Sequence, residues 1–194
     1  MMNAIESAWH VESLFLTTPQ LPTAGNCGPP AMSVLYSFCS LTNCADGSLA
    51  GVGVVFDGAG NLYGMTQTGG AHDYGTVFKL TPNSDGGWTE RVLHNFANHP
   101  ASGPTAGLIF DLAGNLYGTT LSWGPVNWGT VFKMTPNSDG SWAFSVLHIF
   151  MGKPAMLPLA GLVIDKADNL YGTTRTCAKG TNCYGGGVVF EITP

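Results

Sequence analysis

Charged residues are scarce in this 194-residue sequence, at only 10% of the chain. Seven lysines and arginines stand against twelve aspartates and glutamates, which gives a net charge of −5. A nucleic-acid-binding protein usually presents a basic stripe to phosphates, and a polybasic membrane contact needs clustered Lys or Arg. The sequence has neither, so we predict no nucleic-acid partner and no such membrane contact.

Long apolar runs and familiar catalytic motifs are also missing. No run approaches the roughly 18 residues of a membrane helix, so no membrane span is predicted. Residues 1–19 lack a positive leading segment and carry Glu6 and Glu12, so we do not interpret them as a signal peptide. The nucleophile elbow Gly-x-Ser-x-Gly, the metalloprotease motif His-Glu-x-x-His and the phosphate loop do not occur.

Glycine, proline and aromatic residues are abundant instead. The chain has 27 glycines and 12 prolines, with 11% aromatic and 44% apolar residues. That much apolar surface can offset the entropy of ordering the chain, so the composition does not indicate disorder. Evenly spaced turns in a Gly-rich, aromatic-rich chain are typical of an all-β protein.

One hairpin motif occurs three times, at residues 53–64, 107–120 and 161–174. Its middle copy reads Gly-Leu-Ile-Phe-Asp-Leu-Ala-Gly-Asn-Leu-Tyr-Gly-Thr-Thr. Asn61, Asn115 and Asn169 stand 54 residues apart in each interval. Such a fixed period indicates a repeat architecture.

The repeat extends beyond the hairpin. Residues 75–88 match 129–142, and residues 91–96 match 145–150. Each unit therefore contains four short strands bounded by Gly, Pro, Asn or Asp. Four strands in about 54 residues correspond to one β-propeller blade. We predict an all-β fold, a β-propeller of four-stranded blades with about three blades per chain.

The two ends of the chain interrupt the pattern. Residues 1–30 form an irregular N-terminal segment with a degraded strand, and residues 31–194 form the propeller domain. This domain contains an orphan fourth strand (33–38), two blades (51–96 and 107–150) and an incomplete blade (161–194). Two chains joined head to tail by strand exchange would make a six-bladed homodimeric ring. The alternative is a fragment of a longer repeat array.

The motifs at 107–120, 129–136 and 145–150 closely resemble the GloVer-type tandem repeat of bacterial "choice-of-anchor" proteins. The resemblance covers roughly residues 31–194 and implies an exported or surface-anchored protein, extracellular or periplasmic, with a propeller-like fold. More distantly, the Asp-x-x-Gly-Asn-Leu-Tyr hairpin is similar to that of six-bladed propellers, a group that includes calcium-dependent lactonases.

The five cysteines also suggest export. We expect two local disulfides, Cys39 with Cys44 and Cys177 with Cys183, and Cys27 is left over. Free thiols or a metal site are the alternatives.

Residues that recur in every unit are expected to serve the scaffold. His94 and His148 stand where Tyr36 stands, so we predict that they pack between strands. Asp57, Asp111 and Asp165 are predicted turn formers, with a shared cation site, Ca²⁺ in particular, as the alternative.

Residues outside the repeat are the candidates for function, and they fall in two sets of loops. The sets are 65–74, 121–128 and 175–186 between second and third strands, and 39–50, 97–106 and 151–160 between units. Alternation of antiparallel strands places both sets on one face, and variable loops on a rigid scaffold commonly bind ligands.

The loop residues suggest several chemistries. Trp123 and Trp128 would stack on a sugar ring or simply cover a blade junction. His72 and Asp73 would form an acid–base pair or metal ligands, or only a solvated turn. Arg175 would contact an anion or form a surface ion pair. His99, Tyr74 and Tyr184 complete the candidates, His99 as a base and the tyrosines as ligand contacts.

Three functions follow in order of preference. The first is an exported repeat protein that binds a small molecule, a glycan or a protein partner through the variable loops. The second is a Ca²⁺-dependent hydrolase that acts on a lactone or an ester. The third is a structural or adhesive surface module without a ligand.

Overall fold

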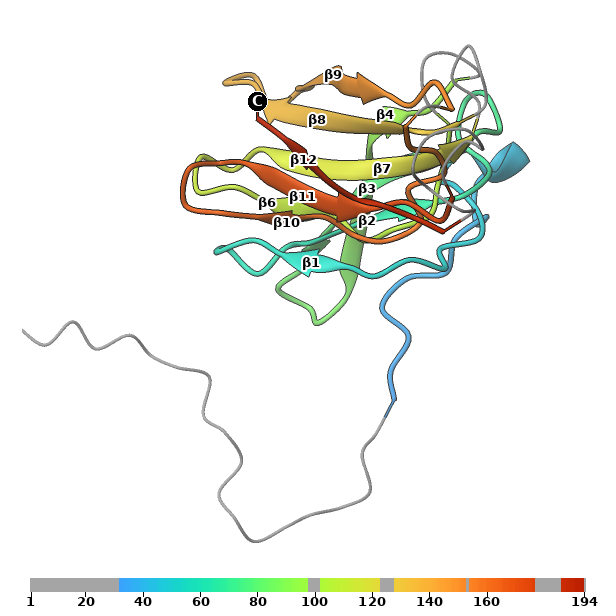
Figure 1. Ribbon diagram of the computed structural model, residues 1–194. Coiled ribbons are helices and arrows are strands. Elements are labelled where there is room, and N and C mark those ends of the chain that lie inside the picture. The colour runs from blue at the N-terminus through green and yellow to red at the C-terminus, as the bar shows by residue number, and fades with distance from the viewer. Residues whose placement is uncertain (1–31, 98–101, 123–127, 153, 177–185, 194) are drawn as a thin grey trace, which may run out of the picture. The chain divides into compact units, whose positions relative to one another are not determined.

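The computed structural model describes residues 32–97, 102–122, 128–152, 154–176 and 186–193 (Figure 1). The chain divides into two compact units, Met1–Val34 and Leu35–Pro194. The predicted boundary was 30/31, and the observed one follows Val34. Only residues 32–34 of the first unit are described.

The second unit is built of antiparallel sheets, which confirms the predicted all-β class. The first sheet has the order β1 (Val55–Phe56), β2 (Leu62–Thr66), β3 (Thr76–Pro82) and β4 (Trp88–Asn95). The second contains β5 (Ser102–Pro104), β6 (Ile109–Phe110), β7 (Leu116–Ser122), β8 (Thr130–Pro136) and β9 (Trp142–Ile149). The third has the order β10 (Val163–Ile164), β11 (Leu170–Thr173) and β12 (Val189–Ile192).

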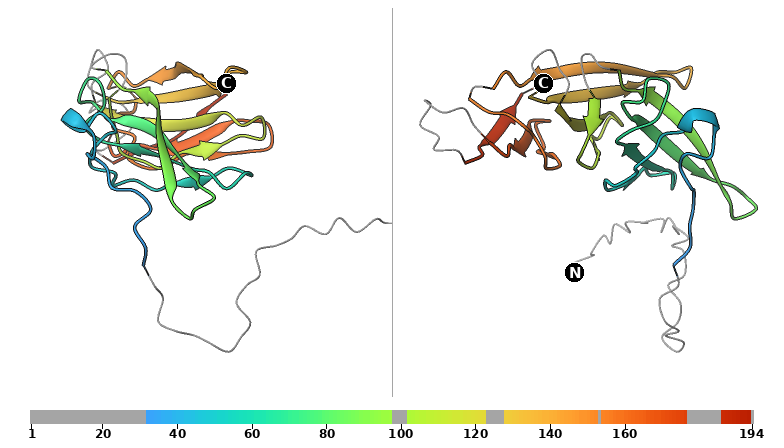
Figure 2. Two further views of the ribbon diagram at one scale, coloured as in Figure 1. Left: turned by 180° about the vertical axis from the view of Figure 1, so that it is seen from behind. Right: turned by 90° about the vertical axis from the view of Figure 1, so that its right-hand side faces the viewer.

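The strand register repeats with the sequence. Corresponding pairs between the second and third strands of a unit are Leu62↔Leu80, Leu116↔Met134 and Leu170↔Ile192. Both complete units shift register at the same place, between Val77 and Phe78 and between Val131 and Phe132. Each repeat copy therefore forms one sheet, and the sheets follow one another along the second unit (Figure 2).

The predicted strand at residues 33–38 is not formed. Residues 32–37 have no regular secondary structure, and a bend begins at Phe38. A strand needs a neighbouring strand to complete its backbone hydrogen bonds, and none of the described strands pairs with this segment. A short 3-10 turn, η1 (Thr42–Cys44), follows at a place where the sequence predicted only a loop.

Two apolar clusters join the sheets. Tyr63, Met65 and Val77 of the first sheet pack with Leu116 and Phe132 of the second. The second and third sheets are joined in the same way by a cluster whose buried members are Tyr117, Val131, Phe150, Ala155, Leu162 and Leu170. None of the described elements is a helix with the length and hydropathy needed to cross a bilayer.

A glycine on each second strand receives a phenylalanine ring from the third strand. A Cβ added to Gly64, Gly118 or Gly172 would stand 2.4–2.6 Å from the ring of the phenylalanine opposite it. Real side chains do not approach so closely, so the ring would have to move out of its packed position. The invariant Tyr-Gly pair of the repeat is thus a packing requirement.

We therefore predict that Gly118→Ala destabilises the protein by about 1–3 kcal/mol, the usual cost of overpacking a core. Gly58→Ala is the matched control, because nothing lies within 4 Å of the position of its added Cβ. Urea unfolding followed by tryptophan fluorescence measures both. Equal midpoints for the two variants would contradict the packing argument.

Candidate functional site

Two sets of loops meet along one edge of the sheets. A backbone bridge connects the segment that enters each unit with the end of that unit's second strand. The bridges are Ser48↔Thr68, Ser102↔Ser122 and Met156↔Thr176. They recur at 54-residue spacing although the loop sequences differ, so the scaffold holds variable loops on a constant frame. We call the described loop residues 39–50, 67–75, 102–106, 128, 154–160 and 174–176 the loop face.

Threonines lie buried beneath these loops. The Thr66 and Thr76 hydroxyls are 2.9 Å apart, and those of Thr120 and Thr130 are 2.8 Å apart. In the third unit Thr174 Oγ1 instead accepts a hydrogen bond of 3.2 Å from the backbone N–H of Val188. A satisfied polar contact in a buried position fixes the local geometry, so the loops start from a rigid base.

The first loop is closed by a disulfide between Cys39 and Cys44, as predicted. Asp46 lies behind it, fully buried. Its carboxylate accepts hydrogen bonds from the Tyr36 hydroxyl at 2.9 Å and from the Ser40 backbone N–H and hydroxyl at 2.9 and 2.8 Å. Burial alone would raise the pKa of Asp46, but the hydrogen bonds from Ser40 and Tyr36 outweigh it and lower the pKa.

Glu90 on β4 is the most perturbed carboxyl near this loop. Its Oε1 is buried without a hydrogen-bond partner. Burial, with a further contribution from the negative charge of Asp46, raises the pKa of Glu90 to about 7. In the next unit the corresponding residue is Phe144, since Glu90 pairs with Leu80 as Phe144 pairs with Met134. Glu90 is thus an ionisable group in a position suited to an aromatic ring.

His72 and Asp73 lie in one tight turn on the loop face. Asp73 has a positive φ of 60°, and its Oδ1 accepts a hydrogen bond of 2.9 Å from the backbone N–H of Gly69. His72 is exposed. Tyr74 packs against the apolar cluster of the first two sheets, and its C=O accepts from Gly103 N–H at 3.2 Å. Asp73 therefore orders its own turn.

The backbones of Trp128 and Arg175 are both hydrogen-bonded to Leu157, at one bend of the chain. Leu157, at a positive φ of 61°, donates its backbone N–H to the Trp128 carbonyl and accepts from the Arg175 N–H, both at 2.9 Å. The Trp128 indole is 36% exposed and covers Gly152, where an added Cβ would stand 3.2 Å from the indole nitrogen. Arg175 is exposed. The backbones of two predicted ligand contacts are therefore both hydrogen-bonded to Leu157.

The repeated aspartates lie in the hairpin turns. Asp57 Oδ1 accepts hydrogen bonds from the Ala59 and Asn61 N–H groups, and Oδ2 accepts from the Asn61 amide and the Tyr63 hydroxyl. Asp111 and Asp165 accept from the corresponding Asn and Tyr residues. Burial would raise the pKa of Asp57, but these hydrogen bonds lower it. A cation would have to compete with all of these donors.

The turns of the second and third units approach each other. Asp111, Asp165, Asp168 and Lys166 line a shared cavity of about 570 Å³. Asp168 replaces the glycine of the other turns and adopts a left-handed φ of 64°, a region that aspartate tolerates better than most residues. Within the described residues, no group of three or more His, Cys, Asp or Glu side chains has a geometry that could hold a metal ion.

The recurrent histidines pack against aromatic rings, His94 between Phe96 and Phe144 and the more exposed His148 against Phe150. The His94 ring stacks on Phe144 with centroids 4.1 Å apart and an angle of 5° between the planes. Burial lowers the pKa of His94 to about 4 and also lowers that of His148. Both are therefore neutral at pH 7.

Several predicted residues lie outside the described part of the chain: His99, Trp123, Tyr184, Cys177, Cys183 and Cys27. Sequence reasoning also missed Asp46 and Glu90. When the repeats are aligned, Glu90 of the first unit stands at the position of Phe144 in the second. A charged residue at a position that holds an aromatic ring in the other unit could have identified this carboxyl from the sequence.

The comparison with protein families gives one match. The family model of the Gloeobacter/Verrucomicrobia repeat covers residues 25–194, in agreement with the resemblance found in the motifs. No protein with curated annotation matches this chain.

We predict that Glu90→Gln stabilises the protein increasingly as the pH rises. The folded-state pKa of Glu90 lies near 7, above its ordinary value of 4.5. Stability is therefore highest below about pH 4.5 and falls as the pH rises through about 7, because the unfolded chain releases this proton more readily. Glutamine removes that loss.

Melting temperatures of both proteins between pH 4 and 9 measure the effect. The difference between them should grow from pH 4.5 to 7 and then level off. A constant difference across this range would show that Glu90 titrates normally.

We further predict that Asp111→Ala costs about 1–3 kcal/mol, because the Tyr117 hydroxyl and the Asn115 amide lose a partner. Asp139→Ala, in the exposed turn of the same unit, is the control and should have little effect. Thermal unfolding in the presence of Ca²⁺ and of a chelator distinguishes a turn-forming role of Asp111 from a metal-binding one. A Ca²⁺-dependent rise in melting temperature that only Asp111→Ala removes would favour the metal site.

Proposed function

This chain belongs to the Gloeobacter/Verrucomicrobia repeat family, and from that premise we propose that it is a repeat-scaffold protein that binds a ligand through its loop face. The sheets provide a constant frame, and the loops on that frame differ from unit to unit. Proteins commonly carry binding residues on variable loops over a rigid scaffold. A small molecule, a glycan or a protein partner would be held there.

The bend at Leu157 is the observation that supports this proposal most strongly. Its backbone is hydrogen-bonded to the backbones of both Trp128 and Arg175, each at 2.9 Å. An indole contributes a flat apolar surface for stacking. A guanidinium contributes paired N–H donors that suit a carboxylate or a phosphate. We therefore expect a ligand with a flat apolar face and an anionic group, for example an acidic sugar.

The proposal includes location and assembly. The Cys39–Cys44 disulfide is typical of an oxidising compartment, so we place the protein outside the cytoplasm, in the periplasm or the extracellular space. We also propose that the repeat units are propeller blades and that two copies join head to tail as a six-bladed ring. Such a ring would present two equivalent loop faces on one rim.

A Ca²⁺-dependent hydrolase for lactones or esters is the alternative function, and a ligand-free adhesive module is the second alternative. The hydrolase would need its cation to displace the hydrogen bonds that Asp57, Asp111 and Asp165 already accept. Lactone and ester hydrolysis with Ca²⁺ and with a chelator tests it directly. Turnover that the chelator abolishes would replace the binding proposal.

We predict that Trp128→Ala and Arg175→Ala each weaken ligand binding at least tenfold, since each removes one of the two contacts. A glycan array that includes acidic sugars identifies the ligand, and isothermal titration calorimetry measures its affinity. Leu112→Ala and Lys166→Ala are the controls, an exposed apolar residue and an exposed cation in the hairpin turns. Equal affinity of the loop variants and the controls would exclude this site.

A further inference from the structure

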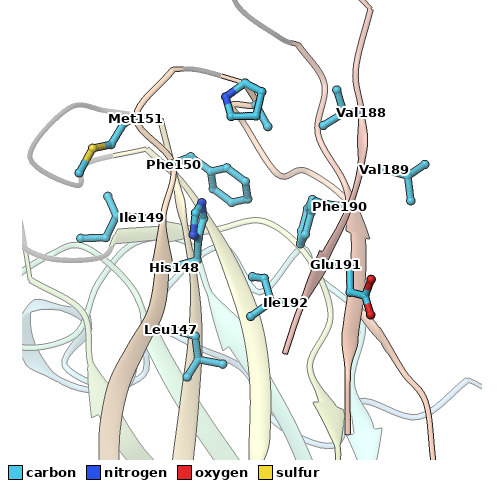
Figure 3. A pocket seen from close by; sticks show the side chains of 12 residues that line it. Leu147, His148, Ile149, Phe150, Met151, Val188, Val189, Phe190, Glu191 and Ile192 are labelled. Carbon is cyan, nitrogen blue, oxygen red and sulfur yellow. The ribbon is translucent and has the colours of Figure 1, made fainter. Parts of the chain in front are cut away.

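An apolar groove runs between β9 and β12, on the open side of the third sheet (Figure 3). It has a volume of about 850 Å³ and is lined by residues 147–151, 154–155 and 188–192. In Figure 3 the rings of His148 and Phe150 face Phe190 and Ile192 across it. The lining is mostly aliphatic and aromatic, with Glu191 as its acidic member.

The preceding junction shows what such a groove holds. Between the first and second sheets, the rings of His94, Phe96 and Phe132 surround a fourth ring, that of Phe144 on β9. The centroid of Phe144 is 4.1 Å from His94, 6.0 Å from Phe96 and 5.3 Å from Phe132. Phe144 is thus supplied by the fourth strand of the unit to which Phe132 belongs.

The groove at β12 repeats three of these four rings. His148 contacts Phe150 at 4.7 Å, and Phe150 contacts Phe190 at 5.3 Å. His148 and Phe150 stand 54 residues after His94 and Phe96. Phe190 corresponds to Phe132 because each lies opposite the glycine of the second strand, Gly172 and Gly118. No described residue takes the place of Phe144. A fourth strand with a large apolar side chain at that position would complete the pocket.

The exposure of β12 indicates the same vacancy. Val189 is 77% exposed, whereas its counterparts Val77 and Val131 are 0% exposed. Phe190 is half-buried, whereas Phe78 and Phe132 are 2% and 0% exposed. The free edge of β12 also leaves backbone N–H and C=O groups for another strand to pair with. A strand on this edge would bury the third sheet as the others are buried.

Residues 32–38 have the sequence of that strand. Ser33-Val34-Leu35-Tyr36 aligns with Ser145-Val146-Leu147-His148 of β9. In this alignment Met32 stands at the position that Phe144 has in the second unit and Glu90 in the first. The described strands do not pair with this segment, and Met32 is 91% exposed.

The part of this segment that belongs to the second unit is engaged at the first sheet of its own chain. Tyr36 and Phe38 pack on Leu62, Phe78 and Leu80 of the first sheet, and the Phe38 and Phe78 rings are 4.6 Å apart. The second sheet lies between that position and the groove, because separate apolar clusters join first to second and second to third. A second copy of the chain carries the same segment and could bring it to the groove.

We propose that residues 32–37 of a second copy pair antiparallel with β12, and that Met32 enters the ring pocket of His148, Phe150 and Phe190. A thioether suits such a pocket, since sulfur packs favourably against aromatic edges. The inference rests on the head-to-tail assembly proposed above and specifies its contacts.

The register follows from the complete units. In those units Val77 pairs with His94, Phe78 with Val92, and Lys79 with Arg91. The inferred pairs are therefore Val189 with Tyr36, Phe190 with Val34, and Glu191 with Ser33 of the second copy. Pairing of residues 32–37 with β12 of another copy would leave the contact of Phe38 with Phe78 in place. Phe96 shows that this is possible, because it follows the fourth strand β4 and packs on Phe132 of the next unit.

Light scattering after size-exclusion chromatography tests the interface. We expect the full 194-residue chain to have the mass of a dimer. Met32→Asp should convert it to a monomer, because a carboxylate would enter the ring pocket. Ser33→Asp is the control on the solvent side of the strand and should stay dimeric. Circular dichroism confirms folding of both variants. A monomeric wild-type chain, or a dimeric Met32→Asp variant, would overturn the inference.

Disulfide cross-linking tests the register. The variant combines Ser33→Cys and Glu191→Cys in a chain whose Cys27, Cys177 and Cys183 are replaced by serine. Residues directly opposite in an antiparallel pair lie about 4.5–5.5 Å apart at Cα, within reach of a disulfide. The control combines Ser33→Cys with Val189→Cys. Position 189 lies two residues from position 191 on the same face of the strand, too far from position 33 for a disulfide to form.

A covalent dimer is expected from the first combination and none from the control. A non-covalent dimer without this cross-link would overturn the register but leave the head-to-tail assembly standing. Ligand titration of Met32→Asp separates this inference from the binding proposal, because Trp128 and Arg175 lie within a single chain. The monomer should bind the ligand with unchanged affinity.

Discussion

The contact on which the structure depends is a ring that leaves one repeat unit and packs on the third strand of the next. Phe96 meets Phe132 at 5.5 Å, and Phe150 meets Phe190 at 5.3 Å. Phe38 meets Phe78 in the same way, although the described residues before it, 32–37, form no strand. No single sheet here is thick enough to bury its own apolar face, so each unit depends on a neighbour. The edges at the two ends of the array follow from this dependence.

The hairpin motif that recurs through the sequence supports this packing through the tyrosine and glycine of each second strand. The aspartate of each turn accepts from Asn and Tyr residues four and six positions later. The tyrosine is thereby held in the junction with its hydroxyl satisfied, and the glycine after it gives room for the phenylalanine ring opposite. The most conspicuous residues of the sequence are therefore structural. The loops that the repeat does not constrain are where we propose that a ligand binds.

The loop face and the groove at β12 would have different roles in an assembled ring. The groove would serve association between copies, whereas the bend at Leu157 lies within one chain. The half-buried Glu90 occupies the position that Phe144 has in the next unit, so the first unit carries an ionisable group where the second carries a ring.

The exact period of 54 residues determined the strand content, the hairpin turns, the left-handed Asp168 and the packing role of His94, because each depends on local spacing and a repeated contact. Residues 33–38 show the limit of that reasoning. They have the sequence of a fourth strand, yet they form none, since a ladder needs a partner that is distant in the chain. Only the tertiary structure linked Trp128 and Arg175 to the backbone of Leu157 and brought Glu90 within the electrostatic influence of Asp46, because the loop residues involved do not repeat in the sequence.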